Sequence, residues 1–141
     1  MTELRFTTIG IPAPQGSKNR FGGEDNPRTK PWRLALAADA QAAGATLMDG
    51  PLTGIVYFYF PRLKGHYRTG KHAGQLRPDA PLSVGGKPDL DKLLRAVGDA
   101  LTGVAYRDDA QIASWHAFKR YGEPARAEVL IREAVKDKAA A

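Results

Sequence analysis

The residues of this chain best suited to chemistry are aspartates, and they gather in residues 87–112. This stretch holds Asp89, Asp91, Asp99, Asp108 and Asp109. Crowded carboxylates repel one another and raise one another's pKa unless a cation is bound between them. Mg²⁺ suits such a place, because it takes one or two carboxylates, keeps several waters and binds the phosphate oxygens of a substrate. The residue types therefore indicate a divalent-metal site, provided that the pair Asp89 and Asp91 lies close in space to the pair Asp108 and Asp109.

Each of these two pairs also has an ordinary structural explanation. Acidic residues at a helix entrance accept backbone hydrogen bonds and complement the helix dipole, which would account for Asp89 and Asp91. An Asp-Asp pair is equally common in turns, which would account for Asp108 and Asp109. Taken singly, each pair favours the structural explanation. The order of the two pairs along the chain is what favours a shared site.

A helix and a strand are expected to position these carboxylates. From residue 90 to residue 101 the apolar side chains recur at helical spacing, and Asp89 stands where it can cap the helix with its carboxylate. A short turn then leads to Asp108 and Asp109, just ahead of a strand expected at residues 111–121. If that strand runs back alongside the helix, the carboxylates converge, with Asp99 and Asp108 in supporting positions.

The rest of the chain supplies four more elements. The apolar pattern predicts strands at residues 4–11, 52–60 and 125–132 and a helix at residues 32–48. The complete order is β-α-β-α-β-β, which predicts an α+β domain with two helices against a single mixed sheet. The 141 residues are expected to form one domain, in which residues 133–141 fray.

The aspartate stretch also carries a resemblance. Residues 87–112 read K-P-D-L-D-x-L-x-x-x-x-x-D-A-L-T-G-V-x-Y-x-D-D-A-Q-I, which resembles the signature of the RusA family of Holliday junction resolvases of bacteria and their phages. Several fixed spacings agree at once over residues 87–119, so the pattern is far more specific than a short motif. Elsewhere the resemblance is looser and includes the Pro-rich segment at residues 11–18.

This resemblance implies a small homodimeric endonuclease that depends on Mg²⁺, with Mn²⁺ as a possible substitute, and that cuts four-way DNA junctions. By motif position, it implies that Asp89, Asp91 and Asp109 bind the metal. It also implies a RusA-like fold and a role in DNA recombination and repair. A twofold-symmetric dimer would suit the two symmetric cuts that resolve a junction.

Three basic residues are candidates to act beside the carboxylates. Lys92 stands where the family pattern usually has Asn, and Arg95 stands where it usually has a functionally important Lys. Arginine keeps its proton and presents a planar fork, so Arg95 can clamp a phosphate but is a poor proton donor. Lys119 also matches a basic position of the pattern. Its alternative explanation is a strand lysine that faces solvent.

The charge of the chain suits a polyanionic partner. Lys and Arg number 21 against 15 Asp and Glu, a net charge of +6, although many proteins are mildly basic without binding nucleic acid. Basic residues gather in two segments without periodicity, 12–30 and 62–86. A solvated loop would also explain the first segment. We expect the second to be a flexible basic loop that orders on DNA, although a disordered insertion would explain it equally well. The residues expected to contact DNA phosphates are Lys18, Arg20, Arg28, Lys30, Arg62, Lys64, Arg68 and Lys71.

Other observations narrow the class of protein. The chain has no cysteine, which excludes disulfides and thiolate sites. Its start lacks the layout of a signal peptide, and its longest apolar run, residues 55–60, is too short to span a bilayer, so we expect a cytoplasmic protein without membrane contact. Two other functions stay open: a branched-DNA-binding protein that has lost cleavage, and a domain that binds or cleaves RNA.

Overall fold

The computed structural model describes residues 2–16, 20–21 and 26–136. Six regular elements follow one another in the expected β-α-β-α-β-β order, which confirms the predicted α+β class. They are β1 (Glu3–Ile9), α1 (Thr29–Ala42), β2 (Leu52–Phe60), α2 (Leu90–Leu101), β3 (Ile112–Tyr121) and β4 (Arg126–Glu133), with short 3₁₀ turns at Lys64–His66, Gly70–His72 and Asp109–Gln111.

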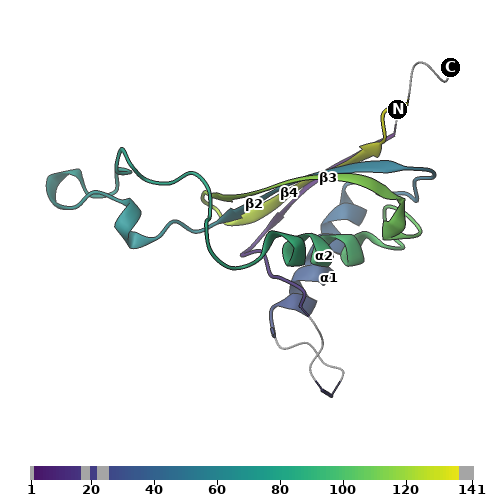
Figure 1. The fold of residues 1–141 in the computed structure, drawn as a ribbon, viewed down its shortest axis with the longest axis horizontal. Coiled ribbons are helices and arrows are strands. Elements are labelled where there is room, and N and C mark those ends of the chain that lie inside the picture. The colour runs from purple at the N-terminus through teal and green to yellow at the C-terminus, as the bar shows by residue number, and fades with distance from the viewer. Residues whose placement is uncertain (1, 17–19, 22–25, 137–141) are drawn as a thin grey trace.

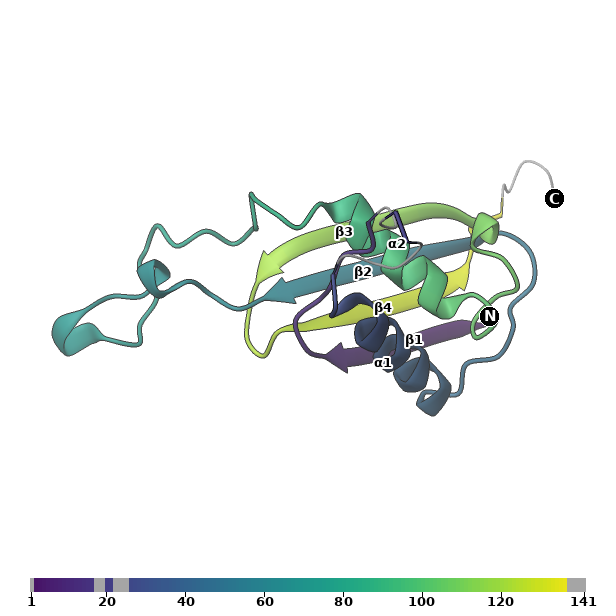
Figure 2. The ribbon, with the colours of Figure 1, turned by 90° about the horizontal axis from the view of Figure 1, so that it is seen from below.

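The strands form a single mixed sheet in the order β1-β4-β2-β3. β4 is antiparallel to both of its neighbours, whereas β2 and β3 are parallel. A parallel pair needs a crossover, and α2 lies within the connection from β2 to β3. Figures 1 and 2 show α1 and α2 side by side on one face of the sheet. The helix that carries the aspartates is therefore held against the strand that follows them.

The hydrophobic core lies between the two helices and the covered face of the sheet. Alternate residues of each strand point into it, as the period of two requires. Its completely buried members include Leu36, Leu52, Val56, Phe58, Leu93, Val97, Leu101 and Ile131. The apolar side of α2 is thus committed to the core, and its polar side is free to form a site.

The first helix ends earlier than expected, at Ala42 instead of near residue 48. Gly44 adopts a φ of 90°, in the left-handed region that suits glycine, and the Ala45 N–H donates to the carbonyl of Ala40 at 3.0 Å. This hydrogen bond closes the last turn of a helix around a glycine and stops its propagation. The segment that follows α1 is therefore not helical, and in it Met48 lies alongside Tyr106. The Met48 N–H donates to the carbonyl of Ala105 at 2.9 Å.

Residues 62–86 form an arm that projects from the end of the sheet (Figure 1). Its two sides are joined by hydrogen bonds from the Arg68 N–H to the Gln75 carbonyl and from the Arg77 N–H to the His66 carbonyl, both 2.8 Å long. The returning side continues along β3, where the Val84 N–H donates to the Lys119 carbonyl at 3.0 Å. The arm therefore has internal structure, and its flexibility in solution stays a prediction.

No helix in the described part of the chain is long and apolar enough to cross a membrane.

Candidate active site

One side of α2 and the turn before β3 enclose a shallow pocket of about 290 Å³. Helix positions 91, 95 and 98 lie one and two turns apart, so their side chains share one side of α2. The pocket is lined by Asp91, Leu94, Arg95, Gly98, Asp109 and Trp115. Two of the three expected metal ligands thus face the same space, together with one of the expected basic residues.

Asp109 is presented by a tightly bonded turn. The carboxylate of Asp108 accepts a hydrogen bond from the Ala110 N–H at 2.9 Å, which caps the 3₁₀ turn that begins at Asp109. The Gln111 side chain accepts from the N–H groups of Arg107 and Asp108 and donates to the Met48 carbonyl at 3.0 Å. Asp108 therefore has a structural role here, and Asp109 is left to point at α2.

Asp109 lies close to α2 at Gly98. A Cβ atom on Gly98 would lie 3.6 Å from an Asp109 carboxylate oxygen, so this carboxylate rests against the backbone of the helix. The buried hydroxyl of Tyr106 donates to the Gly98 carbonyl at 2.9 Å and ties the chain before Asp109 to the same helical turn. Sequence analysis assigned no role to Tyr106, although the tyrosine of the V-x-Y-x-D-D pattern was a usable signal.

The acidic side chains shift the ionisation of their neighbours. Partial burial, the side-chain contact with Asp108 and the charges of Asp99 and Asp108 together raise the pKa of Asp109. Burial, reinforced by the charges of Asp109 and Asp99, raises the pKa of Tyr106 far above its usual range. Tyr106 consequently stays a hydrogen-bond donor at every physiological pH. The carboxylate of Asp109 is destabilised as it stands, a condition that a bound cation would relieve.

Asp89 lies apart from this pocket. It lines a neighbouring pocket of about 350 Å³ with Arg28, Lys87 and Lys92, among others. Its carboxylate forms an ion pair with Lys92 at 3.7 Å and makes no capping hydrogen bond to the α2 backbone. The expectation that Asp89 caps α2 with its carboxylate is therefore wrong, because Lys92 one turn later draws that carboxylate toward its own charge.

The expected cluster of three carboxylates is not assembled. Over residues 2–16, 20–21 and 26–136, no three His, Cys, Asp or Glu side chains are grouped closely enough to hold a metal ion. Asp91 and Asp109 nevertheless provide two carboxylates in one open pocket. That donor set fits Mg²⁺, which leaves its other positions to water and substrate oxygens. Participation of Asp89 stays a prediction.

Lys119 points to the same face of the sheet as Trp115, but its ammonium group already has partners. It donates to the carbonyls of Gly86 at 2.6 Å and Pro88 at 2.9 Å. Both carbonyls belong to the segment that leads into α2. Lys119 therefore positions the segment that leads into α2.

If the pocket cleaves DNA junctions, as the resemblance to the RusA family implies, replacing Lys119 with methionine should slow cleavage by about ten- to a hundredfold, because misplacement of reacting groups by about 1 Å has an effect of that size. The stem of the side chain would remain packed while both hydrogen bonds are lost. Single-turnover cleavage and junction binding measured separately would check this. Lys119→Arg, which keeps the charge and the donors, should retain much of the rate. Equal rates for Lys119→Met and the unaltered protein would contradict the positioning role.

Sequence analysis missed the role of Gln15, which fastens the N-terminal loop to α2. Its N–H donates to the Lys92 carbonyl at 3.0 Å, and its side-chain amide donates to the Asp99 carboxylate. The amide oxygen accepts from Arg33 of α1 at 2.7 Å. The sequence shows that Gln15 lies in the Pro-rich segment. It does not show that Gln15 contacts Arg33, Lys92 and Asp99, which lie far from it along the chain. The carboxylate of Asp99, near Asp109, is therefore engaged by Gln15 and has a structural role.

Trp115 reaches the pocket because its cross-strand neighbour is a glycine. A Cβ on Gly54 would lie 2.2 Å from the Trp115 ring, so only glycine leaves room for it. We expect Gly54→Ala to lower the free energy of unfolding by about 1–3 kcal/mol, the usual effect of overpacking. Chemical denaturation would measure this loss. Gly65→Ala is the matched control, because a Cβ there meets no atom within 4 Å; equal losses in both variants would contradict the explanation.

The expected DNA contacts are spread over two regions. Arg28 lines the Asp89 pocket, and Lys30 is exposed in the first turn of α1. Arg20 lies over the ring of Phe21 at 4.8 Å. Lys18 lies outside the described residues. The other four are carried by the arm: Arg62, Lys64, Arg68 and Lys71. Lys87, which sequence analysis left out, stands beside Arg28 and Lys92 at the Asp89 pocket.

Comparison with known proteins adds two findings. The family model described as Endodeoxyribonuclease RusA matches residues 11–132. The chain is also 31% identical, over 142 aligned residues, to the uncharacterized protein YqaN of Bacillus subtilis (strain 168). That alignment covers 92% of this chain and 96% of YqaN.

Proposed function

Because this chain belongs to the RusA endodeoxyribonuclease family, we propose that it is a divalent-metal-dependent endonuclease that resolves four-way (Holliday) DNA junctions by paired symmetric cuts. The observation that carries the proposal is the convergence of Asp91, Asp109 and Arg95 on one pocket, from a helix and from the turn before β3. Such an enzyme would act in DNA recombination and repair in the cytoplasm of a bacterium or of a phage-infected cell.

Asp91, Asp109 and Arg95 give the pocket side chains that suit phosphodiester hydrolysis. Asp91 and Asp109 would hold a divalent cation, Mg²⁺ with Mn²⁺ as a substitute, and Asp89 would be the third ligand by motif position. When bound, this cation supplies positive charge at the scissile phosphate and lowers the pKa of a bound water. The planar guanidinium of Arg95 clamps the phosphate oxygens and offsets the charge that builds up in the transition state.

Other residues hold this arrangement in place. Lys119 fixes the segment that enters α2, and Tyr106 fixes the turn of α2 against which Asp109 rests. Lys92 adds positive charge beside Asp89. The basic residues of the arm and of the α1 entrance bind the DNA backbone, so that junction affinity falls with rising salt. Two symmetric cuts are best made by a homodimer with two such sites.

The direct test is cleavage of a labelled four-way junction. We expect Mg²⁺ to support paired cuts in opposed strands and an excess of EDTA to abolish them, since the carboxylate pocket needs a cation to act on a phosphate. Competition with duplex DNA and with hairpin RNA, at one stated salt concentration, checks the substrate class. Cutting that persists undiminished in EDTA, or preference for the RNA, would contradict the proposal.

One observation favours the alternative of a branched-DNA-binding protein that cleaves weakly or not at all. The ion pair between Lys92 and Asp89 occupies one of the three expected metal ligands. If that pairing suppresses metal binding, Lys92→Asn, which restores the usual residue of the family pattern, should increase cleavage while leaving junction binding nearly unchanged. If Lys92→Asn cleaves no faster, the ion pair is not what limits the rate.

A further inference from the structure

A small cluster of side chains fastens the arm, residues 62–86, to the end of β3. Within the arm, all of which the structure describes, His66 alone is buried, with 9% of its surface exposed. Its ring meets the Tyr121 ring edge to face, with 4.6 Å between centroids, and the Arg62 guanidinium lies 5.5 Å from the centre of the same tyrosine ring. Such ring and cation–ring contacts stabilise a segment that is otherwise exposed. These three side chains, Arg62, His66 and Tyr121, form the arm root.

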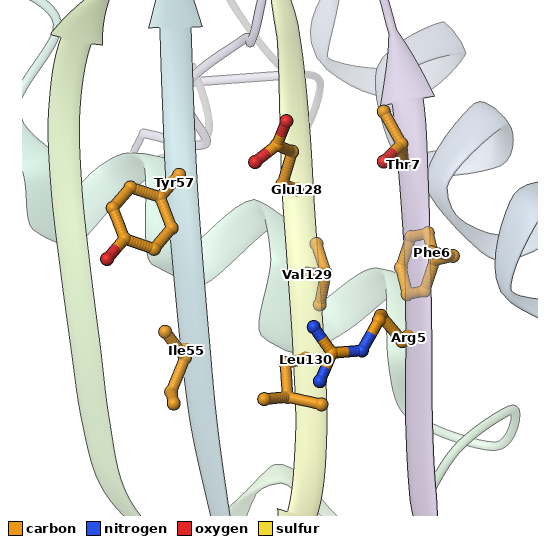
Figure 3. A pocket seen from close by; sticks show the side chains of 8 residues that line it. All are labelled: Arg5, Phe6, Thr7, Ile55, Tyr57, Glu128, Val129 and Leu130. Carbon is orange, nitrogen blue, oxygen red and sulfur yellow. The ribbon is translucent and has the colours of Figure 1, made fainter.

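The arm root lies on the same side of the sheet as α2. Trp115 lines the pocket on α2, and side chains of a strand alternate between its two faces, so Lys119 and Tyr121 point to that side as well. Figure 3 shows the opposite face, which the two helices leave uncovered, with both helices behind the sheet. Tyr121 also packs against the hydrophobic core. The base of the arm is thus joined to the layer that holds the active-site pocket.

The arm root also joins the two sides of the arm. On the outgoing side, His66 Nδ1 accepts a hydrogen bond from the Leu63 N–H at 3.2 Å. Across to the returning side, the Arg62 guanidinium donates to the Pro81 carbonyl at 2.6 Å. Pro81 directly precedes residues 82–84, so the root fixes the point from which the chain returns to the sheet.

Residues 82–84 pair with the free edge of β3. The Tyr121 N–H donates to the Leu82 carbonyl at 2.9 Å, and the Val84 N–H donates to the Lys119 carbonyl at 3.0 Å. A bridge this short at the edge of a sheet has little local stability of its own. It therefore depends on the side-chain contacts that Tyr121 makes with the arm root.

Lys119 is the point at which the arm meets the active site. Its carbonyl accepts from the Val84 N–H, and its ammonium group donates to the carbonyls of Gly86 and Pro88, so one lysine holds the returning chain at three points. Asp89 follows Pro88 directly, and α2 begins with the next residue. A continuous series of contacts thus runs from the arm root to the expected metal ligands.

We propose that Tyr121 is a positioning residue of the active site. Through Lys119 and the returning side of the arm, it fixes the entrance of α2 and with it Asp89 and Asp91. The inference rests on the proposed function for its effect on cleavage. The arm then has two separable tasks, because its basic residues bind DNA phosphates while its root positions the groups that cleave the DNA. A root that only shaped the arm for DNA would affect junction affinity and leave the rate at saturation unchanged.

Single-turnover cleavage of a four-way junction at saturating protein in Mg²⁺, with binding titrated in Ca²⁺, would separate the two tasks. We expect Tyr121→Ala to slow cleavage by at least about tenfold and to change the dissociation constant by less than about threefold, because it misplaces reacting groups without removing a phosphate contact. Tyr121→Phe, which keeps the ring that Arg62 and His66 contact, should retain most of the rate. Weaker binding by Tyr121→Ala with an unchanged rate at saturation would overturn the proposal.

The arm offers a matched pair of histidines as a control. His66 and His72 each end one of the two 3₁₀ turns of the arm, but only His66 belongs to the root. His66→Ala should slow cleavage as Tyr121→Ala does. His72→Ala should cleave at the unaltered rate, since the Gln75 N–H donates to the backbone carbonyl of His72, which alanine keeps. Equal rates for the two histidine variants would overturn the role of the root.

A double variant tests the route through Lys119. If Tyr121 acts through Lys119, Tyr121→Ala/Lys119→Met should cleave about as slowly as the slower single variant, because the two residues belong to one coupled unit. A rate reduced by the product of the two single effects would show that Tyr121 acts independently of Lys119 and would overturn the proposed route.

Amide hydrogen exchange of the metal-free chain tests the same link without cleavage. We expect Tyr121→Ala to speed exchange by at least about tenfold at Val84 and at Leu93, whose N–H donates to the Asp89 carbonyl at 3.1 Å in the first turn of α2. Exchange at Met48, outside the arm and α2, should not change, which shows that the variant is folded. Faster exchange at Leu93 in a chain that never cleaves a junction supports the positioning link and refutes the nuclease. Unchanged exchange at Leu93 overturns the link, whether or not the chain cleaves.

Discussion

Asp109→Asn is expected to reduce the rate of junction cleavage by about a thousandfold, which corresponds to about 4 kcal/mol of transition-state stabilisation. Asp109 is one of the two carboxylates that share the pocket on α2, and the amide that replaces it carries no negative charge to bind a cation. Junction affinity should change little, because we propose that it comes from the basic residues of the arm and the α1 entrance. Single-turnover cleavage and a binding titration in Ca²⁺ would measure the two effects.

The same variant should be more stable than the unaltered protein when metal is removed. The pKa of Asp109 is raised in the folded protein, so its ionised form destabilises the fold at neutral pH, and this penalty disappears as pH falls through the folded pKa. Since the carboxylate is largely exposed, the gain is at most about 1 kcal/mol. Thermal unfolding in EDTA should show an advantage for Asp109→Asn at pH 7 that vanishes below about pH 3.9, the ordinary aspartate value.

Asp39→Asn, a change of the same type on α1 away from the pocket, is the control for both measurements. It should alter neither cleavage nor the pH dependence of stability. If Asp109→Asn cleaves as well as Asp39→Asn, Asp109 does not bind the metal. If it is less stable than the unaltered protein at pH 7 in EDTA, the crowding of acidic groups around Asp109 is not a source of instability.

Arg95→Ala is expected to slow cleavage by about a hundredfold, similar to the removal of one donor from a site that stabilises transition-state charge. Arg95 lines the same pocket as Asp91 and Asp109 and is exposed to an incoming phosphate. Arg95→Lys should restore part of the rate, since lysine keeps the positive charge beside the phosphate but lacks the planar fork. Single-turnover rates at saturating protein would measure the chemical step apart from binding.

The comparison of Arg95→Ala with Arg95→Lys also decides which basic residue supplies the positive charge at the phosphate. If both variants cleave at the unaltered rate, the charge at the phosphate comes from elsewhere, and Lys92 is the next candidate because it lies on the other side of the α2 entrance. If Arg95→Lys exceeds the unaltered rate, proton donation by this side chain contributes, because lysine can release a proton and arginine cannot.

Local sequence determined the elements and their order. Periodicity identified α2, because its apolar residues must all face one core, and a continuous apolar run identified the strand β2, although alternate residues of β2 are only half-buried. The fixed spacing of the aspartate stretch identified the family from the chain alone. The early end of α1 also has a local cause, the glycine at position 44, which the prediction from the apolar pattern did not take into account.

Only the tertiary structure decided which charged groups meet. Asp91 and Asp89 are two residues apart, yet they line different pockets, because successive positions on a helix point in different directions. Lys119 and Pro88 are far apart in the chain, yet a hydrogen bond joins them, since β3 runs beside the α2 entrance. The uncovered face of the sheet likewise follows from where both helices pack. A sequence pattern specifies which residues are apolar or charged, whereas the distances between remote side chains arise only when the strands have paired and the helices have docked.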